Sequence, residues 1–214
     1  MSETPRRFIP AAGRDWLLPL YDPFQRLFGG DAAREMLVSQ ASIASGHRVL
    51  DIGCGTGSLS LAIARRHPGA VVTGLDPDPN ALARAERKAE REGLKVRFER
   101  GFADALPHPP GSFDRVVCSL MLHHLKSDEK RRTLAEVLRV LAPGGQLHAL
   151  DFGSEEGHSG GLLARWFHPP EHLHDNLEGR LPALMREVGF AEAGEVGHRA
   201  TLFGRLAYYR AIPA

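Results

Sequence analysis

The feature that most constrains the fold of this chain is a short apolar run, residues 48–52, that leads directly into a loop with glycine at alternate positions. The glycines are Gly53, Gly55 and Gly57, and apolar residues at helical spacing follow over 58–66. Glycine lets a ligand approach the backbone, and amide groups at the start of a helix favour an anionic or polar ligand. A strand, a glycine loop and a helix in this order predict a site for a nucleotide-like cofactor. A tight turn without a ligand is the alternative interpretation.

The following residues alternate between apolar runs of strand length and stretches with helical periodicity. We expect strands at 48–52, 70–75, 95–99, 113–120 and 146–150. We expect helices at 58–66, from Pro79 (with Asp78 as N-cap) to a stop at Gly93, and at about 128–141, where Pro143-Gly144-Gly145 ends the helix. Strands that alternate with helices favour a parallel sheet covered on both faces.

The two ends of the chain depart from this alternation. Residues 31–44 predict an amphipathic helix with Ala33, Met36, Leu37, Ala41 and Ala44 on its apolar face. Towards the C-terminus, a helix at about 181–188 precedes two segments, roughly 191–199 and 201–212, that we expect to be antiparallel strands. The expected organisation is an N-terminal helical arm or lid at 1–45 and a sheet domain at 46–214, with an insert at 152–180.

The insert is rich in Gly, His and Pro, and is expected to form part of an acceptor pocket. Its apolar wall would be Leu162, Leu163, Trp166 and Phe167. The histidines of 168–174 raise the alternative of a metal ion, because imidazole is a common metal ligand. The two prolines among them prevent a regular helix that would present them together, so we predict no metal site.

Two carboxylates follow the next strands of the expected sheet. Asp76 ends the second strand and lies beside the glycine loop in a right-handed strand–helix–strand unit. Asp104 follows the third strand, within Gly101–Pro107. Acids at the carboxyl ends of parallel strands can bind the hydroxyls of a ribose. Each alone could be a solvated loop residue, but with the glycine loop they predict one ligand crevice.

The composition narrows the choice of partners. With 27 Lys and Arg against 26 Asp and Glu the net charge is +1, which gives no reason to expect nucleic-acid binding. The two cysteines, Cys54 and Cys118, are too few for a disulfide framework or a thiolate metal cage. No run approaches the roughly 20 apolar residues of a membrane span, and the first residues lack a signal-peptide pattern. We expect a cytoplasmic protein without stable membrane insertion; the sequence does not give its oligomeric state.

Four successive motifs resemble those of class I S-adenosylmethionine-dependent methyltransferases, closest to the quinone-biosynthesis and small-molecule branch. They are Asp51–Gly57, Gly74-Leu75-Asp76-Pro77, Ala103-Asp104 and Arg139–Gly145. The resemblance covers about residues 45–152. It implies an α/β, Rossmann-like, doubly wound sheet of seven strands, mostly parallel with the last antiparallel, and helices on both faces. It also implies S-adenosyl-L-methionine as cofactor, with S-adenosyl-L-homocysteine as product.

The resemblance further implies which residues lie at the methionine end of the cofactor. They are Asp51, Gly53, Cys54, Gly55, Gly57 and Ser119. Asp51 would help to orient the amino group, and Ser119 would contribute mainly its backbone. Tyr21 resembles a tyrosine that precedes the first motif in relatives, where the N-terminal segment folds over the cofactor as a lid. Simple packing of an N-terminal arm is the alternative for that segment.

At the adenosine end, the resemblance implies that Asp76 holds the ribose and Pro77 covers one face of the adenine. Asp104 would bind the exocyclic amine, with the backbone of Ala103 and Ala105 nearby. Nicotinamide-dependent oxidoreductases share a glycine loop, but they usually space it G-x-G-x-x-G, and here Ser58 stands at the third position. This class and a non-catalytic cofactor-binding protein are the alternatives.

The acceptor is expected to be a small molecule, methylated by in-line displacement. The fourth strand ends in Cys118-Ser119-Leu120-Met121. It therefore lacks the Asn/Asp-Pro-Pro-aromatic sequence typical of enzymes that methylate exocyclic amines of bases. Transfer from a sulfonium needs chiefly alignment and exclusion of water, and a general base only where the acceptor must lose a proton. His123, His124 and Asp151 are the candidate catalytic residues, with packing or a lid role as the alternative for the histidines.

Overall fold

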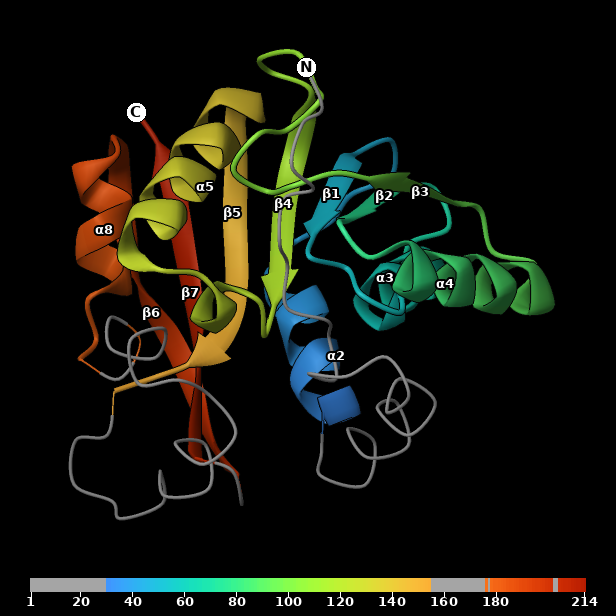
Figure 1. Ribbon diagram of the computed structural model, residues 1–214, viewed down its shortest axis with the longest axis horizontal. Helices are drawn as coiled ribbons and strands as arrows, with labels where there is room; N and C mark the ends of the chain where they lie inside the picture. Colours follow the sequence, from blue (N-terminus) through green and yellow to red (C-terminus); the bar gives the residue numbers. More distant parts are fainter. Residues whose placement is uncertain (1–29, 155–175, 177, 202–203) are drawn as a thin grey trace, which may run out of the picture.

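The computed structural model describes residues 30–154, 176, 178–201 and 204–214. Seven strands in this part of the chain form one sheet in the order β3-β2-β1-β4-β5-β7-β6 (Figure 1). The strands are β1 (Arg48–Ile52), β2 (Val71–Asp76), β3 (Val96–Arg100), β4 (Phe113–Ser119), β5 (Leu141–Phe152), β6 (Phe190–Thr201) and β7 (Gly204–Pro213). The helices are α2 (Gly30–Gln40), α3 (Ser58–Arg66), α4 (Pro79–Glu92), the 3-10 turn η2 (Leu122–His124), α5 (Ser127–Val140) and α8 (Leu181–Glu187).

The strand directions match the expected fold class. Strands β1 to β5 pair in parallel, whereas β7 lies antiparallel between β5 and β6. The mostly parallel, doubly wound sheet with an antiparallel last strand is therefore confirmed. Among the described residues, no helix is long and apolar enough to cross a membrane.

Helix α4 shows how local sequence sets the bounds of an element. The Asp78 side chain accepts a hydrogen bond from the backbone N–H of Asn80 at 2.8 Å, and Pro79 occupies the first turn. The helix ends at Gly93, which adopts φ = 63°. Leu82 and Ala85 are buried on its inner face. The predicted start and stop of this helix are confirmed.

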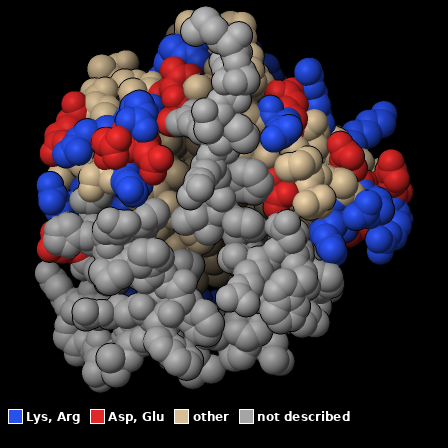
Figure 2. All heavy atoms as spheres, viewed as in Figure 1, with Lys and Arg blue, Asp and Glu red and all other residues tan. Residues whose placement is uncertain are grey.

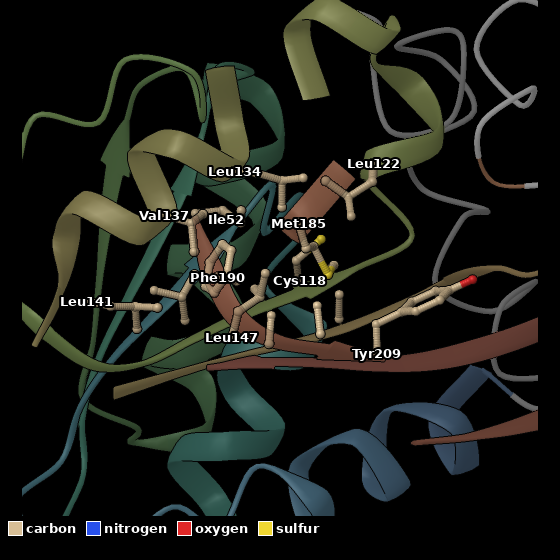
Figure 3. Packing of buried hydrophobic residues seen from close by; sticks show 14 of the residues in the cluster. Ile52, Cys118, Leu122, Leu134, Val137, Leu141, Leu147, Met185, Phe190 and Tyr209 are labelled. Atoms are coloured by element: carbon tan, nitrogen blue, oxygen red, sulfur yellow. The ribbon is translucent and has the colours of Figure 1, made fainter. Parts of the chain in front are cut away.

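The two faces of the sheet bury separate apolar clusters. On one face, α5 and α8 pack over β1, β4, β5, β6 and β7; Figure 3 shows Leu134 and Val137 of α5 and Met185 of α8 meeting Leu147 and Phe190. On the other face, α2 and α3 cover β1, β4 and β5. Because helices cover both faces, water is excluded from the strands, and a polar site can form only at the strand ends.

Strand β5 begins earlier than the sequence predicts. Gln146 was the expected first residue, but β5 starts at Leu141, so Pro143-Gly144-Gly145 lies within the strand. Its register against β4 shifts there, because Phe113 pairs with Leu141 whereas Arg115 pairs with Gln146. Gly144 at φ = 74° allows this irregularity. Regular pairing resumes at Gln146, where the strand was expected.

The predicted apolar face of 31–44 is partly wrong. The helix ends at Gln40, and Met36 is 51% exposed; Ala44, beyond the helix end, is exposed too. Arg34 is buried instead, with its guanidinium paired to Asp31 at 2.5 Å. The buried arc runs through Ala33, Arg34, Leu37, Val38 and Ala41, because the aliphatic stem of arginine can cover apolar surface while its charge is paired.

The order of the strands fixes where a ligand site can form. From β1 the chain steps outward to β2 and β3, then returns to place β4 on the other side of β1 (Figure 1). The connections that follow β1 and β4 therefore diverge, and ligands of such sheets bind in the crevice outside the carboxyl ends of those strands.

Candidate active site

The glycine loop after β1 is fastened to the carboxyl end of β2. The backbone N–H groups of Gly53 and Cys54 both donate to the carbonyl of Leu75, at 2.8 and 3.1 Å. The N–H of Gly55 donates to Oδ2 of Asp76 at 2.8 Å. The loop and the acid that ends β2 are thus one rigid unit.

These bonds correct one expectation about the loop. The N–H of Gly57 donates to the carbonyl of Cys54 at 2.9 Å, so all three glycines and Cys54 use their amides within the protein. They are not free to bind an anionic group. What the loop offers a ligand is close approach and its carbonyl oxygens, which suit a hydrogen-bond donor such as an amino group.

Packing within the protein also demands glycine here. Gly53 adopts φ = 66°, and a Cβ built on it would lie 2.3 Å from Cγ of Met121. Gly57 adopts φ = 76°, and its Cβ would lie 2.7 Å from Cβ of Ala85 in α4. Two glycines assigned to ligand approach are therefore also required where the loop meets η2 and α4.

Asp76 is placed to accept further hydrogen bonds. It is buried, and its Oδ1 accepts from the backbone N–H of Asp78 at 2.9 Å while Oδ2 accepts from Gly55. A carboxylate has about four lone-pair sites, so two protein donors leave capacity for the hydroxyls of a ribose. Burial raises the pKa of the Asp76 carboxyl, and the hydrogen bonds from Asp78 and Gly55 oppose that rise.

Asp51 lies deeper, at the end of β1, and has a partner that the sequence analysis missed. Its side chain is 1% exposed, and Oδ2 accepts from Oγ of Ser60 in α3 at 2.6 Å. Burial raises the pKa of Asp51 to about 7; the bond from Ser60 lowers it, and the nearby Asp76 raises it. In the sequence, the only signal for this contact was a serine, Ser60, that stands between two leucines within 58–66. Its full burial is seen only in the structure.

Side chains of α5 hold the loop that carries Asp104 through hydrogen bonds to its backbone. The N–H of Leu106 donates to Glu136 at 2.8 Å, and Arg139 donates to the carbonyls of Leu106 and His108 at 3.1 and 2.7 Å. Glu136 and Arg139 also pair with each other at 2.7 Å. Opposite charges three residues apart are typical of a pair on the surface of a helix. They did not indicate the loop, which lies about 30 residues earlier in the chain.

Asp104 itself faces a cation. Its side chain is 8% exposed, and Oδ2 accepts from Nε of Arg132 at 3.3 Å. Neighbouring Ala103 is half-buried, whereas Ala105 is exposed and its N–H closes a turn with the carbonyl of Phe102 at 3.1 Å. Pro77, after β2, is half-buried. The residues expected at the adenosine end thus lie on two neighbouring strand ends.

A strained corner follows β4. Ser119 is half-buried, and the next residue, Leu120, has φ = 55°, which is rare for a bulky side chain. The N–H of Leu120 donates to the carbonyl of Leu150 at 2.8 Å and holds the corner against β5. This turn directs η2, with its two histidines, over the carboxyl edge of the sheet.

The three candidate catalytic residues form one connected group. Nδ1 of His123 lies 2.8 Å from Oδ1 of Asp151, and the His123 N–H also points to Asp151, at 3.3 Å. A third donor, the N–H of Phe152, reaches Asp151 at 2.8 Å. His124 is half-buried and its ring lies 4.1 Å from that of His123. Asp151, wholly buried and bound by three donors, is therefore suited to orient His123 rather than to take a proton itself.

The contact with Asp151 determines which ring nitrogen of His123 carries the hydrogen and which carries the lone pair. A neutral imidazole that donates from Nδ1 to a carboxylate carries its lone pair on Nε2. The ring is also set edge-on to Phe152, with centroids 4.9 Å apart. Burial, reinforced by the charge of Asp151, raises the pKa of the neighbouring Cys118 thiol, so that cysteine is an inert part of the core.

A separate hollow of about 370 Å³ is found near the amino ends of β1, β2 and β4. Its lining includes Arg48, Arg97 and His108. Arg48 pairs with Asp114 at 3.1 Å, and Arg97 pairs with Glu99 at 2.6 Å. It lies away from the carboxyl edge and takes no part in the candidate site.

Some predicted site residues lie outside the described part of the chain. They are Tyr21, the apolar wall at 162–167 and the histidines of 168–174. Within the described residues, no group of three or more His, Cys, Asp or Glu side chains is arranged to hold a metal ion.

A glycine loop bonded to an acid at the switch point of a doubly wound sheet defines a class of proteins that bind an adenosine-containing cofactor. A family profile described as a methyltransferase domain matches residues 49–145. A demethylmenaquinone methyltransferase of Thermus thermophilus is 43% identical over 152 residues, which span 70% of this chain and 68% of the relative. The chain belongs to the class I S-adenosylmethionine-dependent methyltransferases, near their quinone-biosynthesis branch.

Two further comparisons agree with this assignment. A demethylmenaquinone methyltransferase of Deinococcus radiodurans is 37% identical over 139 residues, which span 64% of this chain and 57% of the relative. The crystal structure of a methyltransferase from Aquifex aeolicus has a TM-score of 0.71 at 21% identity, covering 92% of this chain and 97% of that one, and so shares the fold. The cofactor is S-adenosylmethionine, which decides between the two cofactors weighed from the sequence.

Proposed function

We propose that this methyltransferase acts on a small, partly apolar molecule with a ring hydroxyl, and that its acceptor class is a hydroquinone. The observation that carries the proposal is the imidazole of His123, held by Asp151 at the sheet edge that also bears the glycine loop and Asp76. A positioned base is of use where the acceptor must lose a proton, as a ring hydroxyl does. The names of the Thermus and Deinococcus relatives support a quinone-derived acceptor.

The surface charge agrees with a small acceptor rather than a polyanion. In the view of Figure 2, basic and acidic side chains lie next to one another over the described surface of α4 and α5. The net charge of the whole chain is +1. A nucleic-acid substrate would call for clustered positive charge on one face.

The proposed contacts to S-adenosylmethionine follow the chemistry of the described residues. Asp76 would accept from the ribose hydroxyls and Asp104 from the adenine amine, beside Pro77, Ala103 and Ala105. Loop carbonyls from 53–57, together with Ser119 and the deep Asp51, would receive the amino group directly or through water. These acceptors suit the hydrogen-bond donors of the cofactor, which are its ammonium group, its ribose hydroxyls and its adenine amine, and the buried acids suit its cationic centre.

In the proposed reaction, the bound cofactor supplies an electrophilic methyl group. Nε2 of His123 would take the hydroxyl proton of the acceptor, and the imidazolium so formed would be stabilised by Asp151. The released electron pair makes a ring carbon nucleophilic, and this carbon takes the methyl group while S-adenosylhomocysteine leaves. The carbon then loses its hydrogen as a proton, and the ring oxygen regains a proton from the His123 imidazolium. Overall one ring hydrogen is replaced by methyl and one proton is released. The protein contributes alignment, the base and exclusion of water.

The proposal is tested by turnover with a reduced short-chain naphthoquinone, its oxidised form, a simple phenol and an amine. We expect S-adenosylhomocysteine to form with the reduced naphthoquinone and not with the oxidised form or the amine. Calorimetry with S-adenosylmethionine in the same samples verifies that the cofactor site is intact. Tight cofactor binding without product from any acceptor would overturn the proposal in favour of non-catalytic binding.

A further inference from the structure

One buried polar atom at the carboxyl end of β5 is left without a partner. Asn176 is wholly buried, and its Nδ2 donates to the carbonyl of Phe152 at 3.4 Å. Its Oδ1 is buried too, and within the described residues nothing donates to it. Buried amide oxygens are nearly always hydrogen-bonded, because an unpaired one loses its interaction with water without replacement.

The orientation of this amide is determined by its surroundings. Turning it by 180° would set Oδ1 against the carbonyl of Phe152, and two acceptors would then face each other. That carbonyl also accepts a hydrogen bond from the hydroxyl of Tyr209 at 3.5 Å. Oδ1 of Asn176 is therefore the end of the amide that does not face the Phe152 carbonyl, and it is a buried acceptor without a donor among the described residues.

Phe152 connects this atom to the proposed catalytic pair. Its carbonyl binds Asn176, its N–H binds Asp151 at 2.8 Å, and its ring contacts the ring of His123. A group that donates to Oδ1 thus binds at the acceptor end of the site, next to the base and on the strand end that supports it.

We propose that Oδ1 of Asn176 accepts a hydrogen bond from a hydroxyl of the methyl acceptor and so selects the reduced, hydroquinone form over the quinone. The inference rests on the proposed function. A hydroquinone offers O–H donors, whereas a quinone offers only acceptors and would leave Oδ1 unpaired. Sites built to bind a substrate hydroxyl discriminate strongly against analogues that lack it, because the buried partner is then left unsatisfied.

The test measures how tightly the protein, with S-adenosylhomocysteine bound, binds three compounds: a naphthohydroquinone, its dimethyl ether and the corresponding quinone. For the unmodified protein we expect the hydroquinone to bind about 10- to 100-fold more tightly than either compound without an O–H. In Asn176→Leu, which keeps the volume but removes Oδ1, the preference for the hydroquinone should fall to the part that His123 supplies, whereas His123→Phe should keep the part that Oδ1 supplies. Tyr209→Phe is the matched control, because it removes the other donor to the Phe152 carbonyl and leaves Oδ1 in place; it should keep the preference.

Each outcome bears on the inference. Equal affinities in the unmodified protein would overturn it without any variant, and would mean that the chain itself satisfies Oδ1. A preference as large in Asn176→Leu as in the unmodified protein would overturn it too. If Asn176→Leu does not fold, as judged by its S-adenosylhomocysteine affinity and thermal unfolding, His123→Phe decides, because a preference that disappears there comes from His123 alone. Because binding is measured without turnover, a protein that prefers the hydroquinone but forms no product contradicts the proposed function and leaves this inference standing.

Discussion

The backbone N–H of Gly55 donates to Oδ2 of Asp76 across 2.8 Å, so one bond holds the loop after β1 to the acid at the end of β2. The carboxylate that is proposed to bind ribose is therefore fixed before the cofactor arrives. A preorganised acceptor loses less conformational entropy on binding than a mobile side chain would.

Asp76→Asn should weaken cofactor binding. The amide keeps the shape but loses the charge and part of the acceptor capacity, so we expect a loss of about 1–3 kcal/mol in binding S-adenosylhomocysteine. Isothermal titration calorimetry measures this directly. Asp114→Asn is the control, since Asp114 pairs with Arg48 at the amino end of β1, away from the site. An unchanged dissociation constant would remove Asp76 from the ribose role.

Asp51→Asn should change how stability depends on pH. The pKa of Asp51 is raised to about 7 in the folded state from 3.8 in the unfolded state. Between these values the folded protein binds more protons than the unfolded chain, so this group lowers stability progressively as pH rises from about 4 to about 7, with no further loss above that. The asparagine does not titrate and can still accept from Ser60.

The measurement is the free energy of unfolding by urea at several pH values. The difference between Asp51→Asn and the unmodified protein should grow in favour of the variant from about pH 5 to about pH 7 and then level off. At the same time the variant should bind S-adenosylhomocysteine less tightly, if Asp51 helps to orient the amino group. A difference that is flat across this range would contradict the raised pKa.

His123→Gln and Asp151→Asn should reduce turnover and leave cofactor binding intact. Loss of a positioned general base costs about 10²- to 10⁴-fold in rate, and Asp151→Asn removes the carboxylate that orients the ring. Initial rates of S-adenosylhomocysteine formation at saturating cofactor give the readout, and calorimetry with S-adenosylhomocysteine verifies that the cofactor site is intact. His124→Gln is the matched comparison on the same turn. Should His124→Gln prove the more damaging variant, the assignment to His123 is wrong.

Arg139→Leu should loosen the adenosine end of the site from a distance. Arg139 and Glu136 fix the backbone of 106–108 behind Asp104. Their hydrogen bond lowers the pKa of Glu136, so its contribution is present above the unfolded pKa and is lost as pH falls through the lower folded value. We expect weaker S-adenosylhomocysteine binding with little change in the rate at saturating cofactor. A rate defect at saturation would indicate a wider disturbance of α5.

The sequence predicted those parts of the fold that short stretches determine. Asp78, Pro79 and Gly93 bound their helix by capping and turn chemistry alone, and the glycine loop was located by its spacing. The start of β5 was not predictable in this way, because Pro143-Gly144-Gly145 has the composition of a loop and only pairing with β4 draws it into the sheet. Pairing with a neighbouring strand can thus outweigh the preference of a local sequence for a loop.

The residues of the candidate site also fall into those that the sequence could predict and those that it could not. The strand-end acids could be placed because parallel strands end at one edge of a sheet. Ser60, Glu136 and Arg139 could not, because each acts on a residue that only the fold brings near. The loop amides show the converse error: a glycine-rich sequence suggested free donors, whereas the fold uses those of Gly53, Cys54, Gly55 and Gly57 internally.

Gly57→Ala should destabilise the protein by more than its backbone angle alone explains. Both Gly57 (φ = 76°) and Gly93 (φ = 63°) lie in the left-handed region, but a Cβ at Gly93 would meet nothing within 4 Å, whereas at Gly57 it would lie 2.7 Å from Cβ of Ala85. Gly93→Ala therefore measures the conformational cost, about 1–2 kcal/mol. The excess in Gly57→Ala measures the clash with Ala85 of α4 together with the closer approach to Phe98 of β3, whose Cζ would lie 3.0 Å away. Adding Ala85→Gly to Gly57→Ala should recover part of that excess in urea unfolding, as a double-mutant cycle would reveal. Equal losses in the two single variants, with no recovery in the double variant, would mean that Gly57 is kept for the ligand and not for packing against α4.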